Sequence, residues 1–378
     1  MQLRVLHLVK TSTGASWAFR QTRELVKLGI QVHVALPPNG NSGIMEKSGI
    51  IVHRLQPDLP MHQPWIWPRR LKQLKALISY VNPHVIHSHF VGTTLAMRLS
   101  LGRTHWTPRL FQVPGPLHLE HKFFRELDVG TAGRVDRWVA SCQWTYDRYL
   151  NEGIGKDRVF LSYYGIDLNS FSNAYPGKLR CELGLASQSP LIGMVAYMYP
   201  PKHYLGQKRG LKGHEDLIDA VALCRQRLPG IKVVFIGGAW NNTTGYERTI
   251  HRYARQRLGN DAIFLGTRND VNQLYPDLDV AVHPSHSENL GGAGESLLSC
   301  VPTIATNVGG FPDIVIPNQT GWLVPAHDPV RLADTIIEVL RDPLRARRLA
   351  AAGRERVRHL LDIRENARQI KEIYDSVL

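Results

Sequence analysis

The stretch SENLGGAGESL, Ser287–Leu297, stands between two apolar runs, DVAVHPS before it and VPTIATNVGG after it. Both runs have the length and apolar character of buried strands. Glycines occupy the loop between them at Gly291, Gly292 and Gly294, and Glu295 opens the apolar-periodic run ESLLSC. This order of strand, glycine-rich loop, helix and strand predicts one unit of a parallel α/β sheet.

The loop and the helix start carry the chemistry of a nucleotide-diphosphate site. Ligands bind at the carboxyl ends of parallel strands, where glycine lets the backbone approach them without an intervening Cβ. Free N–H groups at a helix start favour a phosphate, and the Glu295 carboxylate can accept two hydrogen bonds from a ribose diol. Glu288 would face the group attached to the far phosphate. The predicted donor-binding residues of this stretch are Asn289, Leu290, Gly291, Gly292 and Glu295.

A plainer alternative exists for the same stretch. Glu295 would then be only a favourable charge at a helix start, and the glycines would only form a turn. The loop matches neither the P-loop nor the GxGxxG pattern, so further residues must decide between the two interpretations.

The rest of the chain repeats the alternation of short strands and longer helices. Helical periodicity marks SWAFRQTRELVKLG, GHEDLIDAVALCRQRL and DPVRLADTIIEVLRDP. The predicted strands are RVLHLV, QVHVALP, IIVHRL, HVIHSHF, RLFQVPG, RWVASC and RVFLSYYG, followed by LIGMVAYM, KVVFIGG, AIFLGT, VAVHPS, TIATNVGG and GWLVP. The two series predict an α/β protein with two doubly wound parallel sheets, joined through a linker rich in Ser, Asn, Gly and Pro at residues 163–190.

Composition limits the function classes. The 378 residues suit two domains, and a hydrophobic fraction of 43% provides for a sizeable core. No apolar run reaches the roughly 18 residues of a membrane helix, and the start lacks a secretory signal, so we predict a cytoplasmic protein. The four cysteines lie far apart, which favours reduced thiols over disulfides or a zinc site. The net charge of +14 favours an anionic partner, such as a phosphorylated substrate, an anionic membrane surface or nucleic acid, and nucleic acid ranks last because no nucleic-acid motif is present.

The segment HPSHSENLGGAGESLLSCVPTIATNVGGFPDIV, with GWLVP after it, resembles the nucleotide-sugar site of the retaining family-4 glycosyltransferases. The resemblance implies the GT-B fold, in which two Rossmann-like doubly wound domains face a central cleft. It implies that Glu295 binds the ribose hydroxyls and that Glu288 contacts the transferred sugar and its phosphate. Six residues separate the two glutamates where the family usually has seven, and counting back would place Ser287 at the first position. We retain Glu288 as a candidate catalytic residue, because a glycine-rich loop can absorb one residue.

Other residues complete the predicted site. Lys212, in RGLKGHEDLIDA, matches a lysine that the family places against a β-phosphate, and we assign it a catalytic role. The family's upstream arginine is replaced by a longer loop, in which Lys202, Lys208 and Arg209 are candidates. We favour Arg209 because a guanidinium can bind a phosphate with two parallel hydrogen bonds.

The first domain resembles the family more loosely. Gly14 matches a glycine of the loop after the first strand, which would border the donor's phosphate, and His118 matches a histidine near the sugar and is our third candidate catalytic residue. An ordinary turn and a surface histidine are the alternatives. His84, His87 and His89 support the placement of their strand, and we expect packing or loop-ordering roles for them rather than metal binding. The resulting domains are residues 1–172, which would bind the acceptor, and 173–362, which would bind the donor, with the last helix at 363–378 crossing back to the first.

The resemblance implies transfer of a hexose-type sugar, with retention, from a nucleotide diphosphate to an acceptor hydroxyl. UDP is the expected nucleotide, although GDP and ADP would fit the same loop. The acceptor would be a glycan, a lipid-linked sugar or a small molecule, without a metal ion or other cofactor. The alternatives are a nucleotide-sugar epimerase and a non-catalytic nucleotide-sugar-binding subunit. The segment MHQPWIWPRRLKQLKALISY could dock on an anionic membrane or pack its aromatics internally.

Overall fold

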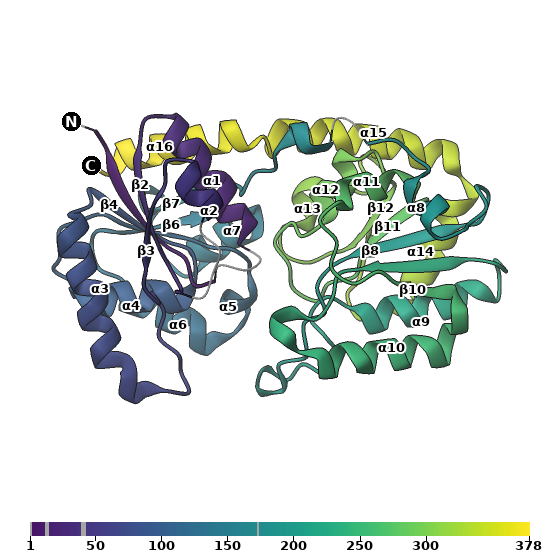
Figure 1. Ribbon diagram of the computed structural model, residues 1–378, viewed down its shortest axis with the longest axis horizontal. Helices are drawn as coiled ribbons and strands as arrows, with labels where there is room; N and C mark the ends of the chain where they lie inside the picture. Colours follow the sequence, from purple (N-terminus) through teal and green to yellow (C-terminus); the bar gives the residue numbers. More distant parts are fainter. Residues whose placement is uncertain (1, 12–14, 39–42, 172–173) are drawn as a thin grey trace. The chain divides into compact units, whose positions relative to one another are not determined.

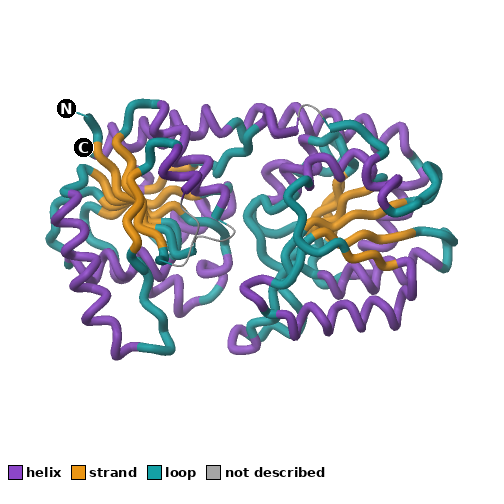
Figure 2. The backbone as a smooth tube through the Cα atoms, in the orientation of Figure 1, coloured by secondary structure: helices purple, strands orange, loops and turns teal. Residues whose placement is uncertain are grey.

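A computed structural model describes residues 2–11, 15–38, 43–171 and 174–378. The chain forms two compact units. Unit 1 comprises Met1–Asp167 and Leu360–Leu378, and unit 2 comprises Leu168–His359. Strands form the centre of each unit and helices surround them (Figure 2).

Unit 1 contains a seven-stranded sheet in which every neighbouring pair is parallel. Its spatial order is β3 (Ile51–Arg54), β2 (Gln31–Leu36), β1 (Arg4–Leu8), β4 (Val85–Ser88), β5 (Arg109–Gln112), β6 (Asp136–Ala140) and β7 (Val159–Leu161). The order reverses between β1 and β4, which is the topological switch point of a doubly wound fold.

Helices cover both faces of this sheet (Figure 1). Along β1, Val5 packs with Ile370 and Tyr374 of the last helix, whereas Leu6 and Leu8 pack on the opposite face with Leu74. This alternation follows from the two-residue period of a strand. The helices are α1 (Ser16–Lys27), α2 (Gly43–Lys47), α3 (Trp67–Val81), α4 (Val91–Leu101), α5 (Leu117–Glu120), α6 (Lys122–Thr131), α7 (Gln143–Asn151) and α16 (Ile363–Val377), with 3-10 turns at Pro64–Ile66 and Lys156–Arg158.

Unit 2 repeats the same winding with six parallel strands. Its order is β10 (Ala262–Phe264), β9 (Lys232–Ile236), β8 (Leu191–Val195), β11 (Val280–His283), β12 (Thr303–Thr306) and β13 (Trp322–Val324). The switch point lies between β8 and β11. The loops that follow these two strands therefore flank the position at which such sheets bind ligands.

The helices of unit 2 bury the two faces of its sheet. Ile192 and Met194 of β8 pack on one face with Leu217 and Leu332, and Leu191 packs on the other with Leu274. The helices are α8 (Lys178–Glu182), α9 (His214–Arg225), α10 (Thr244–Leu258), α11 (Val271–Leu274), α12 (Ala293–Leu298), α13 (Phe311–Ile314), α14 (Pro329–Arg341) and α15 (Pro343–Leu360). The 3-10 turns are Leu168–Phe171, His203–Leu205, Trp240–Asn242, Gly259–Asp261 and Tyr275–Asp277.

The predicted fold class is confirmed. Each predicted strand overlaps one strand of the structure, and the three helices predicted from periodicity are α1, α9 and α14. The predicted linker holds two short helical segments, Leu168–Phe171 and α8. Within the described ranges, no helix has both the length and the apolar character that crossing a bilayer requires.

Candidate active site

The loops after β8 and β11 meet at the switch point of unit 2. The His286 N–H donates to the carbonyl of Leu211 at 2.8 Å, which joins the two loops. Gly213, the residue before α9, has a φ of +73°, and a Cβ there would lie 2.0 Å from the Pro284 carbonyl oxygen. Only glycine allows this approach. The sequence KGH therefore places Lys212 directly against the loop that carries Glu288.

Lys212 and Glu288 form an ion pair through Nζ and Oε2. The two side chains are 18% and 14% exposed, so solvent screens the contact only in part. Glu288 Oε1 also accepts the N–H of Asn289 at 3.0 Å. The structure thus brings together two residues that the sequence analysis assigned to catalysis, 76 positions apart.

The glycine-rich loop leads from Glu288 into α12. Gly291 has a φ of +47°, and Gly292 precedes the first residue of the helix. Leu290 and Asn289 are buried, and the side-chain oxygen of Asn289 has no hydrogen-bond partner among the described residues. A buried acceptor without a partner is uncommon in folded proteins. It is the kind of group that a hydroxyl of a bound ligand would satisfy.

Glu295 lies in the first turn of α12, as predicted from the sequence, and is partly exposed. Burial raises the pKa of Tyr275, and the Glu295 carboxylate raises it further. The Tyr275 hydroxyl therefore stays protonated beside that carboxylate, and it donates to the Gly292 carbonyl at 3.3 Å.

Arg209 is held away from the role predicted for it. Its two terminal nitrogens bond to Asp216 at 2.5 Å and to Asp219 at 2.7 Å, both on α9. His286 Nε2 reaches the other oxygen of Asp216 at 2.5 Å. Burial alone would raise the pKa of Asp216, but its bonds to His286 and Arg209 lower it. The guanidinium is thus an anchor for the loop in this structure.

His118, the third predicted catalytic residue, lies in unit 1 on α5. Its Nε2 is 3.2 Å from the Tyr149 hydroxyl and 3.4 Å from Oδ2 of the buried Asp128. Asp128 also binds Arg98 at 2.9 Å. Burial would raise the pKa of Asp128, but the His118 and Arg98 contacts lower it. The sequence analysis did not identify this carboxylate.

Gly14, the predicted donor-binding residue of the first domain, lies outside the described residues.

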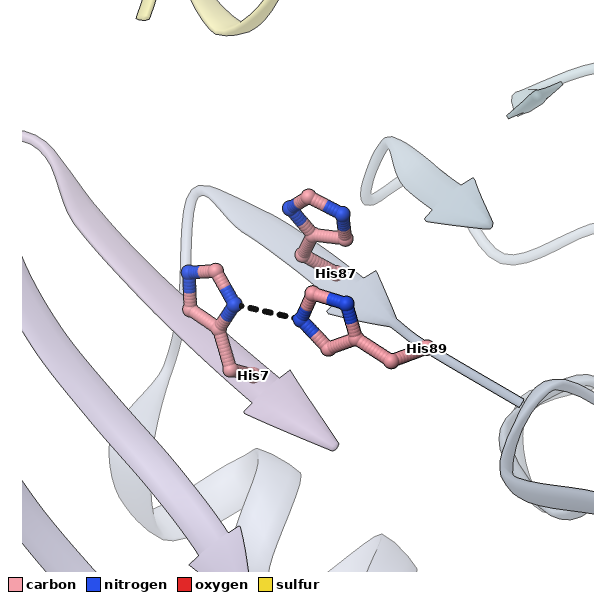
Figure 3. A group of neighbouring side chains, drawn as sticks. All are labelled: His7, His87 and His89. Carbon is pink, nitrogen blue, oxygen red and sulfur yellow. Dashed lines mark hydrogen bonds between the residues drawn. The ribbon is translucent and has the colours of Figure 1, made fainter. Parts of the chain in front are cut away.

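A cluster of buried histidines lies at the switch point of unit 1, on its α16 side (Figure 3). It consists of His7 on β1 with His87 and His89 at the end of β4. His7 Nδ1 is 2.9 Å from His89 Nε2, and the three rings are stacked in pairs. One nitrogen of His7 and one of His89 are already bonded to each other, and His87 Nδ1 is 2.6 Å from the Tyr374 hydroxyl, so these nitrogens have partners within the protein. The geometry suits packing better than a metal site.

Hydrogen bonds assign the protons of this cluster. The Tyr164 hydroxyl donates to the Gln112 carbonyl at 3.2 Å, so it accepts from His89 Nδ1 at 2.8 Å. His89 Nε2 then accepts from His7, whose Nε2 accepts from the Tyr374 hydroxyl at 3.3 Å. The Tyr374 oxygen in turn accepts from His87 Nδ1 at 2.6 Å, and the buried His87 Nε2 is left as an acceptor without a partner among the described residues. The opposite polarity would make that nitrogen an unpaired N–H donor, which costs more. Each ring is therefore neutral with its proton on Nδ1.

Two family models match the chain. "Glycosyltransferase Family 4" covers residues 15–170, and "Glycosyl transferases group 1" covers residues 203–356. The D-inositol 3-phosphate glycosyltransferase of Xylanimonas cellulosilytica is 31% identical over 213 residues, 53% of this chain and 48% of that protein. The enzyme of that name from Acidothermus cellulolyticus is 28% identical over 284 residues, 69% of this chain and 60% of that protein. The matched region thus spans about half to three-fifths of each relative.

Solved structures share the whole fold. Anabaena HepE in complex with UDP-glucose has a TM-score of 0.81 at 21% identity, over 99% of this chain and 100% of that one. Sucrose-phosphate synthase from Thermosynechococcus elongatus has a TM-score of 0.79 at 20% identity, over 100% of this chain and 99% of that one. The chain belongs to the family-4 glycosyltransferases and has the GT-B fold.

Proposed function

We propose that the protein transfers a hexose-type sugar from a nucleotide diphosphate, with UDP as the expected nucleotide, to an acceptor hydroxyl. The observation that carries the proposal is the Lys212–Glu288 ion pair at the switch point, beside a glycine-rich turn. The names of the curated relatives and the UDP-sugar bound by HepE support the same reaction class.

The residues have complementary roles in this reaction. As the bond between the sugar and the diphosphate breaks, charge develops on the leaving phosphate. Lys212 and the backbone N–H groups of residues 290–292 would stabilise that charge, and this stabilisation is largest in a site with little water. Glu295 would bind the ribose hydroxyls, and the unpaired side-chain oxygen of Asn289 would accept a hydrogen bond from a hydroxyl of the nucleotide sugar.

We propose that the product retains the anomeric configuration. The acceptor oxygen would bond to the anomeric carbon as the bond to the diphosphate breaks, and a leaving phosphate oxygen would take the acceptor's proton. The alternative, a covalent intermediate on Glu288, requires a free carboxylate nucleophile. Both Glu288 oxygens already have partners, Lys212 and the Asn289 N–H, which disfavours that path.

Nucleotide release from UDP-, GDP- and ADP-sugars tests the proposal, measured with and without a panel of acceptors. The panel includes inositol 3-phosphate, because the curated relatives are named for it. Release that requires an acceptor supports a transferase, and release or isomerisation without one supports an epimerase. Binding without turnover would indicate the non-catalytic alternative. NMR of the product must show the retained anomer, and an inverted product would contradict the mechanism.

Peripheral binding to an anionic membrane is a second part of the proposal. Trp65 is 72% exposed, and Arg69, Lys72 and Lys75 on α3 are exposed beyond it. Trp67, by contrast, packs on the core of unit 1, and its indole N–H donates to the Pro60 carbonyl at 2.9 Å. Sedimentation with phosphatidylglycerol vesicles tests the contact. Loss of sedimentation in Lys72→Glu/Lys75→Glu would support it, and failure of the wild type to sediment would exclude it.

A further inference from the structure

The segment after β8 extends the sheet beyond the strand end and carries aromatic residues. Met198 pairs with Ala239 as a parallel bridge, and the Trp240 N–H donates to the Met198 carbonyl at 3.2 Å. Met198 is buried in the core, so Tyr197 and Tyr199 share the opposite face. Both rings contact Trp240, with centroids at 5.4 Å and 4.8 Å. These partly exposed residues, Tyr197, Tyr199 and Trp240, form an aromatic shelf at the switch point.

Tyr199 connects this shelf to the candidate active site. The Lys212 ammonium lies 5.5 Å from the centre of the Tyr199 ring, within the range of a cation–π contact. Burial raises the pKa of Tyr199, and the Glu288 carboxylate adds to the effect. The phenol is therefore a neutral hydrogen-bond donor, and its hydroxyl has no hydrogen-bond partner in the part of the chain that the structure describes.

Arg209, on the same loop, is not available to bind the diphosphate. Arg209 binds Asp216 and Asp219 through its two terminal nitrogens, and breaking both contacts would leave two carboxylates that are largely buried without that partner. The match to the "Glycosyl transferases group 1" model begins at residue 203, beyond Tyr199. Tyr197 and Tyr199 thus lie before that match begins, whereas Trp240 lies within it.

We propose that Tyr199 binds the nucleotide-sugar donor. Trp240 supports the ring from one side, Lys212 lies beside it, and the hydroxyl donates to an oxygen of the diphosphate. Tyr199 would take the place of the arginine that the family usually has upstream of the lysine, with a neutral hydrogen-bond donor instead of a cation. This inference rests on the proposed function, because it assumes that Lys212 contacts the same diphosphate.

Isothermal titration with the tightest-binding of UDP, GDP and ADP, and with its bare nucleoside, tests the inference. Tyr199→Phe keeps the ring and removes only the hydroxyl, and should weaken binding of the nucleoside diphosphate about tenfold, the value of one hydrogen bond to a charged group. Binding of the nucleoside should not change, because it has no phosphate. Tyr204→Phe is the matched control, since Tyr204 lies on the same loop and is 75% exposed. It should bind like the wild type.

Lys212→Ala separates this inference from the proposed function. If Lys212→Ala binds the nucleoside diphosphate weakly and Tyr199→Phe binds it like the wild type, the role of Tyr199 is refuted and the site stands. Equal weakening of diphosphate and nucleoside by Tyr199→Phe would also refute it, because a phosphate contact cannot cause that. If Lys212→Ala binds normally, or the wild type binds none of the three diphosphates, both proposals fail.

Discussion

Replacing Gly213 by alanine tests how closely the site depends on the approach of two loops. Gly213 lies between Lys212 and α9 and has a φ of +73°. An added Cβ would lie 2.0 Å from the Pro284 carbonyl oxygen, whereas real Cβ contacts below 3.0 Å essentially never occur. The two loops must therefore separate by about 1 Å, the difference between the two distances. That separation moves Lys212 away from the loop of Glu288.

Two costs follow from the substitution. An alanine in the left-handed region costs about 1–2 kcal/mol, which lowers Tm by about 2–8 °C for a unit of this size. The displacement acts on the reaction, because misplacing a catalytic group by about 1 Å can lower the rate about 100-fold. We expect kcat/KM of Gly213→Ala to fall by about that factor, measured as acceptor-dependent nucleotide release.

Gly206→Ala is the control, because it carries the same backbone strain without the collision. Gly206 lies in the same loop with a φ of +75°, and a Cβ there would meet nothing within 4 Å. It should lose stability within the same range and keep the wild-type kcat/KM. If Gly213→Ala also keeps the wild-type kcat/KM and loses no more stability than Gly206→Ala, the close approach does not position Lys212 and the reasoning is wrong.

Other predictions concern single residues. Lys212→Ala should lower kcat about 100- to 1,000-fold, as the loss of one group that stabilises transition-state charge does, and a wild-type kcat would exclude its phosphate role. Glu295→Ala should raise KM for the nucleotide sugar about tenfold, and an unchanged KM would contradict ribose binding. Burial lowers the pKa of His7 from 6.5 to about 3, so below pH 6.5 the unfolded chain takes up a proton that the folded chain does not. The free energy of unfolding should therefore decrease as the pH is lowered below 6.5, by about 1.4 kcal/mol per pH unit for this histidine. A Tm independent of pH between about pH 7 and pH 5 would contradict a buried neutral ring.

The strands were predictable because parallel strands covered on both faces are continuous apolar runs. The order of the strands was not, since nothing in the runs says which neighbour each will take. Lys212 and Glu288 meet because β8 and β11 are adjacent at the switch point, although they are the first and fourth strands of unit 2 in chain order. The resemblance identified both residues, but only the topology explains why they touch.

Arg209 shows where reasoning from residue type fails. A guanidinium fork suits a phosphate, and it suits two carboxylates equally well. Asp216 and Asp219 are three residues apart, so they lie on one face of α9, and the helix begins five residues after Arg209. The spacing of these acidic residues was visible in RGLKGHEDLID and could have indicated the competing partner. Tyr199 gave no such signal, because its role depends on Trp240 of a different loop.

His118 shows how a buried charge decides what a neighbouring side chain can do. Tyr149 donates its proton to Asp128 at 2.8 Å, so the Tyr149 oxygen accepts from His118 Nε2. In the neutral ring the lone pair then lies on Nδ1, which can accept a hydrogen bond from a sugar hydroxyl but cannot donate one. The sequence around His118 could not predict this hydrogen-bond arrangement, because Asp128 is paired with Arg98 of α4, 30 positions away in the sequence.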